Sequence, residues 1–195
     1  YTELIGQERA LDEIKQFSQQ ILIIPGNWDS LHFPHFFGEY DLHEKSIKDE
    51  QELKIAGYGS ADVIPIFLPP TRTIPFSHER VYEFLRQRDA DIVLTHMSPY
   101  SILDSTENGS RGSLGCLAYL RTNQPDLLLC GHYHSSVGDK LDEPSGTVVI
   151  NSGNLGRYGN DNYGNFSEMD YNQSEGRITN ITHHKIRDSI LFSTP

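Results

Sequence analysis

Two histidines separated by a single residue, His132 and His134, are the clearest chemical signal in this sequence. They follow residues 126–130, an apolar run with the length of a buried strand. Imidazole is the commonest protein ligand for transition metals, and Gly131 lets the backbone come close to a bound group. An ordinary pair of loop histidines would have the same pattern, so the interpretation depends on the rest of the chain.

Three other apolar runs are also followed by polar residues that can bind metals or substrates. The carboxyl ends of parallel strands lie along one edge of a sheet, so we expect these residues to converge. An amide oxygen with several imidazoles suits Mn, Fe, Zn, Ni or Co better than Mg or Ca. The runs and the residues after them are 21–24 with Asn27, Trp28 and Asp29, 91–94 with His96, and 148–150 with Asn151, Ser152 and Gly153.

The elements that must position these residues alternate between helix and strand. Apolar periodicity predicts helices over residues 8–20, 77–88 and 113–121, with a further strand at 54–59. Residues 166–171 and 177–181 alternate around a turn and predict an antiparallel hairpin, in which His183 and His184 would be exposed. This order predicts one α/β domain over residues 1–195 with a mixed sheet system.

Composition excludes several classes of protein. With 195 residues and a net charge of -11, the chain offers little to a nucleic-acid backbone. No stretch of 18 apolar residues predicts a membrane span, and two cysteines are too few for a disulfide framework. We therefore expect a cytoplasmic protein that acts on small molecules, and the sequence is compatible with a homo-oligomer.

Together, the four strand-end motifs resemble those of the calcineurin-like metallophosphoesterases. In that family they read Gly-Asn-His-Asp/Glu, Thr-His-x-Pro-Pro, Gly-His-x-His and Asn-Pro-Gly, in this order. The resemblance covers residues 20–155. It implies a four-layer α/β/β/α sandwich with two divalent transition-metal ions, Mn being the preferred metal.

The resemblance also implies roles for individual residues. Asn27, His96 and His132 correspond to ligands of one metal, and His134 to a ligand of the other. The implied catalytic group is Asn27, His96 and Asp29, with Asp29 orienting the site. Trp28 is assigned to substrate binding, and the backbone N–H groups of Gly112 and Ser113 are expected to face an anionic substrate.

The sequence departs from the family pattern in two ways. Trp28 replaces the histidine that resembles a general acid, and an indole cannot donate a proton in that role. Members of the family that lack this histidine resemble phosphodiesterases, so the resemblance favours a phosphodiesterase over a monoesterase. The family's amino-terminal Asp-x-His and Gly-Asp-x-x-Asp motifs are absent from residues 1–195. The chain begins at Tyr1, so we expect an amino-terminally truncated domain that lacks its first strand and helix.

Two hypotheses follow for the function. The first is a metal-dependent phosphoesterase with a two-metal mechanism, in which a metal-activated hydroxide attacks a phosphodiester. The second is a non-catalytic binding or scaffolding protein on the same fold, which the missing amino-terminal ligands would permit. The metal content of the full-length protein distinguishes these two hypotheses.

Overall fold

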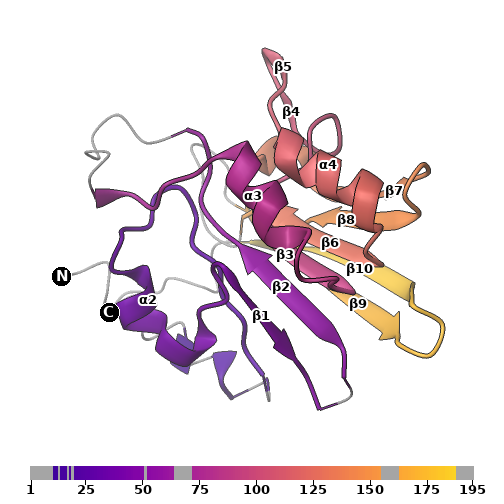
Figure 1. The fold of residues 1–195 in the computed structure, drawn as a ribbon, viewed down its shortest axis with the longest axis horizontal. Helices are drawn as coiled ribbons and strands as arrows, with labels where there is room; N and C mark the ends of the chain where they lie inside the picture. Colours follow the sequence, from indigo (N-terminus) through magenta and orange to yellow (C-terminus); the bar gives the residue numbers. More distant parts are fainter. Residues whose placement is uncertain are drawn as a thin grey trace.

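The computed structural model describes residues 11–63, 72–154 and 163–187, except for 13, 17, 19 and 51. Its centre is a six-stranded sheet in the order β1-β2-β3-β6-β8-β7 (Figure 1). The four inner strands run parallel, and the two edge strands pair antiparallel to their neighbours. The strands are β1 Lys45–Lys48, β2 Lys54–Tyr58, β3 Ile92–Met97, β6 Leu127–Gly131, β7 Gly138–Asp142 and β8 Thr147–Asn151.

Two helices, α3 (His78–Leu85) and α4 (Leu114–Asn123), cover one face of this sheet (Figure 1). Each begins where the sequence predicts, because the hydroxyl of Ser77 or Ser113 accepts a hydrogen bond from an N–H of the first turn. The main core lies between these helices and the sheet. It includes the fully buried residues Val81, Leu85, Val93, Tyr119, Leu120, Leu128 and Val149.

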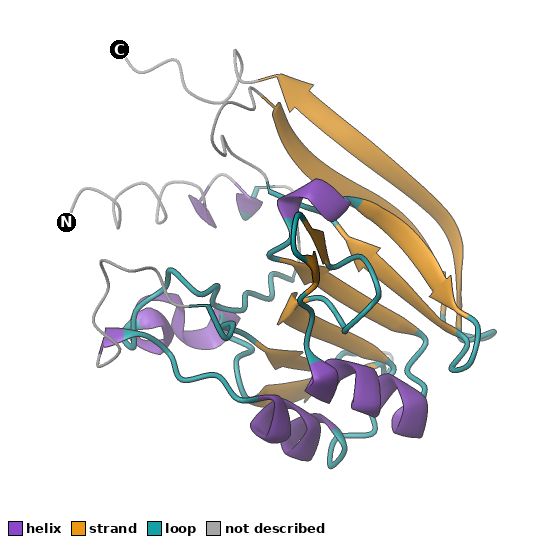
Figure 2. Cartoon of the chain, turned by 90° about the horizontal axis from the view of Figure 1, so that it is seen from above, coloured by secondary structure: helices purple, strands orange, loops and turns teal. Residues whose placement is uncertain are grey.

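A long hairpin of β9 (Tyr163–Asn172) and β10 (Arg177–Arg187) forms a second, two-stranded sheet. It lies on the side of the main sheet that faces away from α3 and α4 (Figure 2). The hydroxyl of Tyr171 donates to Asp126 Oδ2 over 2.6 Å and ties the hairpin to the start of β6. The described residues therefore form three layers in the order α/β/β, and the outer helical layer of the expected four-layer sandwich is not among them.

The remaining elements are short and lie outside the main layers. None of the helices that the structure describes is long and apolar enough to cross a membrane. These elements are α2 (Phe33–Phe37), η1 (Gly38–Tyr40), the small hairpin of β4 (Ser105–Thr106) and β5 (Gly109–Ser110), and η3 (His134–Ser136).

The structure corrects the sequence-based expectation at one predicted strand. Residues 21–24 do not join the sheet, and only Ile23 forms an isolated bridge, with Asp41. Hydrogen bonds from Ile23 N to Tyr40 O and from Leu42 N to Ile23 O account for that bridge. An apolar run can be predicted from sequence, but a strand also needs a partner along its length.

Two edge strands were missed because their sequences carry little apolar signal. β1 reads KSIK and β7 reads GDKLD, and most of their side chains are exposed. The helix predicted over residues 8–20 lies largely outside the described residues, although 11, 12 and 14 are helical. The other predicted strands and helices are confirmed, with boundaries that differ by a few residues.

Gly115 of α4 packs directly against the backbone of His78 in α3, and a methyl group there should destabilise the fold. A Cβ at this position would lie 2.0 Å from the backbone oxygen of His78, so the two helices would have to separate. We expect Gly115→Ala to lower the free energy of unfolding by about 1–3 kcal/mol, the usual cost of overpacking, in urea denaturation. Gly131→Ala is the control, because its Cβ would have only ordinary contacts at 3.6 Å and beyond. Equal stabilities of the two variants would contradict the prediction.

Candidate metal centre

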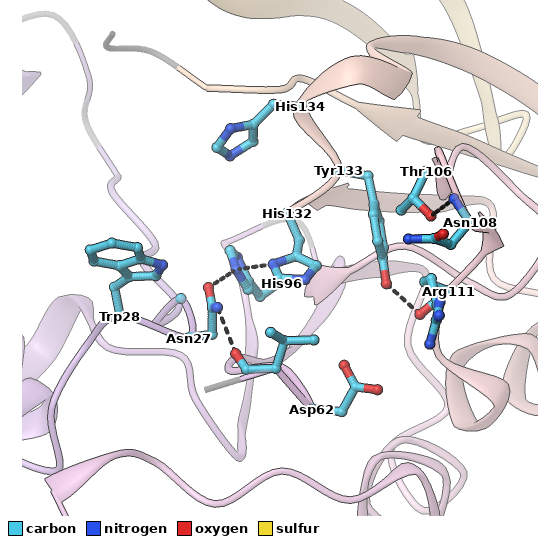
Figure 3. Close-up of a pocket in the computed structure, with 12 residues that line it drawn as sticks. Asn27, Trp28, Asp62, His96, Thr106, Asn108, Arg111, His132, Tyr133 and His134 are labelled. Carbon is cyan, nitrogen blue, oxygen red and sulfur yellow. Dashed lines mark hydrogen bonds between the residues drawn. The ribbon is translucent and has the colours of Figure 1, made fainter. Parts of the chain in front are cut away.

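Three of the predicted ligand atoms meet at the carboxyl edge of the parallel sheet. His96 lies near the end of β3, and His132 directly follows β6. Asn27 Oδ1 is 3.1 Å from His96 Nε2, which in turn is 3.2 Å from His132 Nδ1 (Figure 3). The parallel order of β3 and β6 brings His96 and His132 together, as the sequence predicts.

Asn27 reaches this position although no strand precedes it. The turn that carries it is held against the end of β2, where Ser60 N donates to Pro25 O over 2.7 Å. Its own amide Nδ2 donates to Val63 O at 2.7 Å. Because the nitrogen is committed to that carbonyl, the oxygen must face His96, which is the orientation a metal ligand requires.

The turn that carries His132 has a strained backbone, and hydrogen bonds from Asn151 hold this turn in place. His132 has a φ of 65°, an uncommon value for a residue with a side chain. The buried Asn151 at the end of β8 donates through Nδ2 to Tyr133 O at 3.0 Å and to Leu103 O at 3.2 Å. Its oxygen accepts from Gly153 N at 2.8 Å. Asn151 thus fixes the backbone between the two predicted histidine ligands.

All three imidazoles at the site favour the neutral form that binds metals. Burial, followed by the neighbouring His132 and His134, lowers the pKa of His96 to about 3. Burial also lowers the pKa of His132, against an opposing effect of the Asp62 carboxylate, and it lowers the pKa of His134. Neutral imidazoles keep a nitrogen lone pair for coordination at neutral pH.

The convergent donor atoms have the spacing expected around one ion. Two ligand atoms that each lie about 2.1 Å from an ion are about 3.0–3.4 Å apart at tetrahedral or octahedral angles. The separations of 3.1 and 3.2 Å fall in this range. One of the three donors is the amide oxygen of Asn27. Without it, no group of three histidine, cysteine, aspartate or glutamate side chains among the described residues is placed to hold an ion. Asn27, His96 and His132 therefore fit one metal.

A cavity of about 600 Å³ opens above these three residues, and His134 and Trp28 also line it. His134 stands apart from the other two imidazoles (Figure 3), so it does not belong to the set of three convergent donors. The Trp28 side chain is 63% exposed, which places the indole at the rim. Asp29 is not in the lining: its Oδ2 accepts from Gly26 N at 2.7 Å and holds the turn, and burial raises its pKa. The predicted orienting role of Asp29 stays a prediction.

The family model for calcineurin-like phosphoesterases matches residues 5–136, about two thirds of the chain. The chain belongs to the calcineurin-like phosphoesterase family. Membership supports, in general terms, a phosphoesterase with divalent metal ions as cofactors and phosphate esters as substrates. No curated protein matches the sequence.

Two solved structures are similar to this calcineurin-like phosphoesterase at low sequence identity. One crystal structure is 16% identical with a TM-score of 0.64, and the match covers 93% of this chain and 72% of the other. The crystal structure of TT1561 of Thermus thermophilus is 15% identical with a TM-score of 0.45, covering 76% of this chain and 59% of the other. The first of these likenesses supports the mixed α/β fold.

The predicted role of Gly112 and Ser113 is wrong, because their N–H groups are already used inside the protein. Gly112 N donates to Asp104 Oδ2 at 2.7 Å, and Ser113 N donates to Ser98 O at 2.8 Å. Neither residue lines the cavity. The sequence pattern predicted an anion site in the loop before this helix. The buried carboxylate of Asp104 accepts the hydrogen bond from Gly112 instead, and the sequence did not indicate that contact.

Other residues line the cavity of this calcineurin-like phosphoesterase that the sequence interpretation did not select. Asp62 follows β2, so its position at another strand end was the signal that could have found it. Arg111 lies one residue before the predicted Gly112, and its carbonyl accepts a hydrogen bond from the Tyr133 hydroxyl (Figure 3). The lining residues missed from sequence are Asp62, Val63, Thr106, Asn108, Arg111 and Tyr133.

Proposed function

We propose that this protein hydrolyses phosphodiester bonds with the help of divalent metal ions. The observation that carries the proposal is the convergence of Asn27 Oδ1, His96 Nε2 and His132 Nδ1 beneath a cavity. The set consists of neutral donors, so an ion held by it keeps its full positive charge toward an anionic substrate. Family membership supports the phosphoesterase class.

The residues around this centre have complementary tasks. A divalent ion bound there would supply charge neutralisation and a water of lowered pKa. Arg111, exposed in the cavity wall, can form charge-assisted hydrogen bonds to phosphoryl oxygens. Its backbone is fixed by the Tyr133 hydroxyl and by Asp104, so the guanidinium extends from a rigid base. Asn27, His96 and His132 would hold the metal, and Asn151 holds the turn that carries His132.

Trp28 supports the preference for diesters. An indole at the rim offers an apolar face to the second ester group of a diester, whereas the additional anionic oxygen of a monoester gains nothing from it. No proton donor is available at that position, because indole N–H does not ionise at neutral pH. Substrates with leaving groups that need no protonation are therefore favoured.

The assay of the full-length protein with Mn²⁺ tests this function. We expect metal-dependent turnover of bis(p-nitrophenyl) phosphate with a higher kcat/KM than for p-nitrophenyl phosphate. The metals Fe, Zn, Ni and Co serve as alternatives in parallel reactions. Absence of turnover of either ester with all five metals would reject the phosphoesterase proposal, and a clear preference for the monoester would reject the diester assignment.

Substituting Trp28 should change the substrate preference. Trp28→His introduces an imidazole that can protonate a leaving oxygen, and positioned general acids contribute about 10²–10⁴-fold. Since this ring would not be optimally placed, we expect the monoester-to-diester ratio of kcat/KM to rise by at least about tenfold, near the low end of that range. Trp28→Phe is the matched control and should leave the ratio unchanged. A similar rise in both variants would show that removal of the indole, and not proton donation, causes the change.

A scaffolding function on the same fold is the second candidate. The observation in its favour is that the described residues offer a convergent donor set for one ion, with His134 apart from it. Metal analysis of the full-length protein separates the candidates. A two-metal enzyme should contain close to two transition-metal ions per chain, and a scaffold should contain few or none.

A further inference from the structure

A second cavity, of about 420 Å³, adjoins the candidate metal centre. It lies between the turn after β6 and the β9–β10 hairpin, and its lining includes residues from both. His134 lines this cavity and the first one, so the two cavities share a wall. A substrate bound at the metal centre could therefore extend past His134 into the second cavity.

The lining of the second cavity is polar and carries positive charge. Lys185 and Asn165 are cross-strand partners in the hairpin, so their side chains point to the same face. Both line the cavity together with Ser135, Asn154 and His183, and none of the described lining residues is a carboxylate. Lys185 forms no ion pair within the described part of the chain. This concentration of donors is unusual in a protein with a net charge of -11.

His183 forms a fixed part of the wall. Its Nδ1 is 2.9 Å from Ser167 Oγ, and its Nε2 is 2.9 Å from Asp139 Oδ1 on β7. Ser167 also accepts a hydrogen bond from Ser152, which follows β8. The imidazole, expected from sequence to be merely exposed, therefore links the hairpin to the main sheet.

Asn165 supplies a second indication of a ligand. Its side-chain Oδ1 is buried and has no hydrogen-bond partner among the residues that the structure describes. Its backbone is held in place, because Asn165 N donates to Asn154 O at 2.6 Å. Buried polar atoms without a partner are rare, and such an acceptor is satisfied by a donor such as a ligand hydroxyl group.

We propose that the second cavity binds a phosphorylated polyol that forms one arm of the diester substrate. Lys185 binds the distal phosphate, and Asn165 Oδ1 accepts a hydrogen bond from a hydroxyl of the same arm. The scissile phosphate lies in the first cavity, beside His134. This inference rests on the proposed phosphodiesterase function and adds the class of alcohol that the enzyme recognises.

Binding can be measured without turnover. Glycerol 3-phosphate is titrated into the chelator-treated, full-length protein, and the ring resonances of His183 are followed by NMR. We expect saturable shifts with glycerol 3-phosphate and none with glycerol. Lys185→Gln should weaken binding at least about tenfold, as expected for loss of a charge-assisted hydrogen bond, whereas Lys140→Gln on β7 should have no effect. Absence of saturable shifts, or equal affinity in Lys185→Gln, would overturn the proposal.

A second variant separates the two contacts. Asn165→Ala should weaken glycerol 3-phosphate binding several-fold, because the hydroxyl loses its acceptor, and should leave the binding of inorganic phosphate unchanged. Equal losses for both ligands would contradict the assigned role of Asn165. The variant keeps the backbone bond to Asn154, so its fold can be verified by the unchanged backbone resonances of the hairpin.

A pair of chromogenic substrates connects binding with catalysis. One is the p-nitrophenyl diester of glycerol, and the other carries an additional phosphate on the distal hydroxyl. We expect Lys185→Gln to lower kcat/KM about tenfold for the phosphorylated substrate only, in line with its effect on binding. Equal effects on both substrates would overturn the assigned cavity. Turnover of neither substrate, with phosphate-ester binding intact, would reject the phosphodiesterase function while the binding site stands.

Discussion

Replacing His132 by glycine is expected to abolish metal-dependent turnover while leaving the fold intact. The substitution removes Nδ1, one of the three donors that converge at the candidate metal centre. Residues that only orient metal ligands contribute about 10–100-fold to affinity or activity, so loss of a ligand should lower kcat/KM by more than about a hundredfold. Metal content, measured by elemental analysis after dialysis, should fall in parallel.

Glycine is the informative replacement because of the backbone at this position. His132 has a φ of 65°, a conformation that costs an L-residue about 1–2 kcal/mol and that glycine adopts freely. The free energy of unfolding of the metal-free protein should therefore stay within about 1 kcal/mol of wild type, since this gain offsets lost packing. His35→Ala, on the exposed side of α2, is the matched histidine control and should retain full activity. Normal turnover in His132→Gly would remove this residue from the site.

Asp104→Ala is expected to be the most destabilising of the substitutions considered. Asp104 is 1% exposed, and its Oδ2 accepts hydrogen bonds from three backbone N–H groups. The donors are Ser101, Arg111 and Gly112, at 2.9, 3.0 and 2.7 Å. An unpaired buried donor costs about 1–3 kcal/mol, so loss of three should lower the free energy of unfolding by at least about 3 kcal/mol in urea denaturation.

The same substitution should also affect activity, because the loop that Asp104 organises carries three residues of the cavity wall. Thr106, Asn108 and Arg111 all lie in the segment that begins beside this carboxylate. Asp104→Asn keeps one acceptor oxygen with nearly the same shape, and should lose clearly less stability and activity than the alanine variant. If the asparagine and alanine variants were equally stable, the three hydrogen bonds would not be what holds the loop.

The location of the two histidines of the candidate metal centre could be predicted from sequence because it depends on strand direction. Three apolar runs were correctly read as parallel strands, and parallel strands end at one edge. His96 and His132 then had to converge, whatever the detailed packing. Asn27 converges for a different reason, since its turn is fastened to the end of β2 by Ser60 and Val63. Those contacts belong to the tertiary structure, and no local sequence pattern predicts them.

The walls of the two cavities depended on the tertiary structure. The backbone N–H groups of Gly112 and Ser113 were expected to be free for an anion, but Asp104 and Ser98 accept from them. Sequence shows which groups can donate hydrogen bonds, whereas the partner of each donor depends on which segments lie within about 3 Å in the folded chain. Lys185 and Asn165 pair within the hairpin. They line a cavity with His134 only once the hairpin packs against the main sheet.

The sequence by itself determined the alternation of helices and strands, the family resemblance, and the convergence of His96 and His132 at the sheet edge. These follow from periodicity and from the direction of parallel strands, which are local properties repeated along the chain. The tertiary structure decided the rest: that residues 21–24 lie outside the sheet, that Asp62 and Arg111 enter the cavity, and that His134 divides it from a second one. These features depend on long-range contacts, because they are decided by which segments pack together and not by any short run of residues.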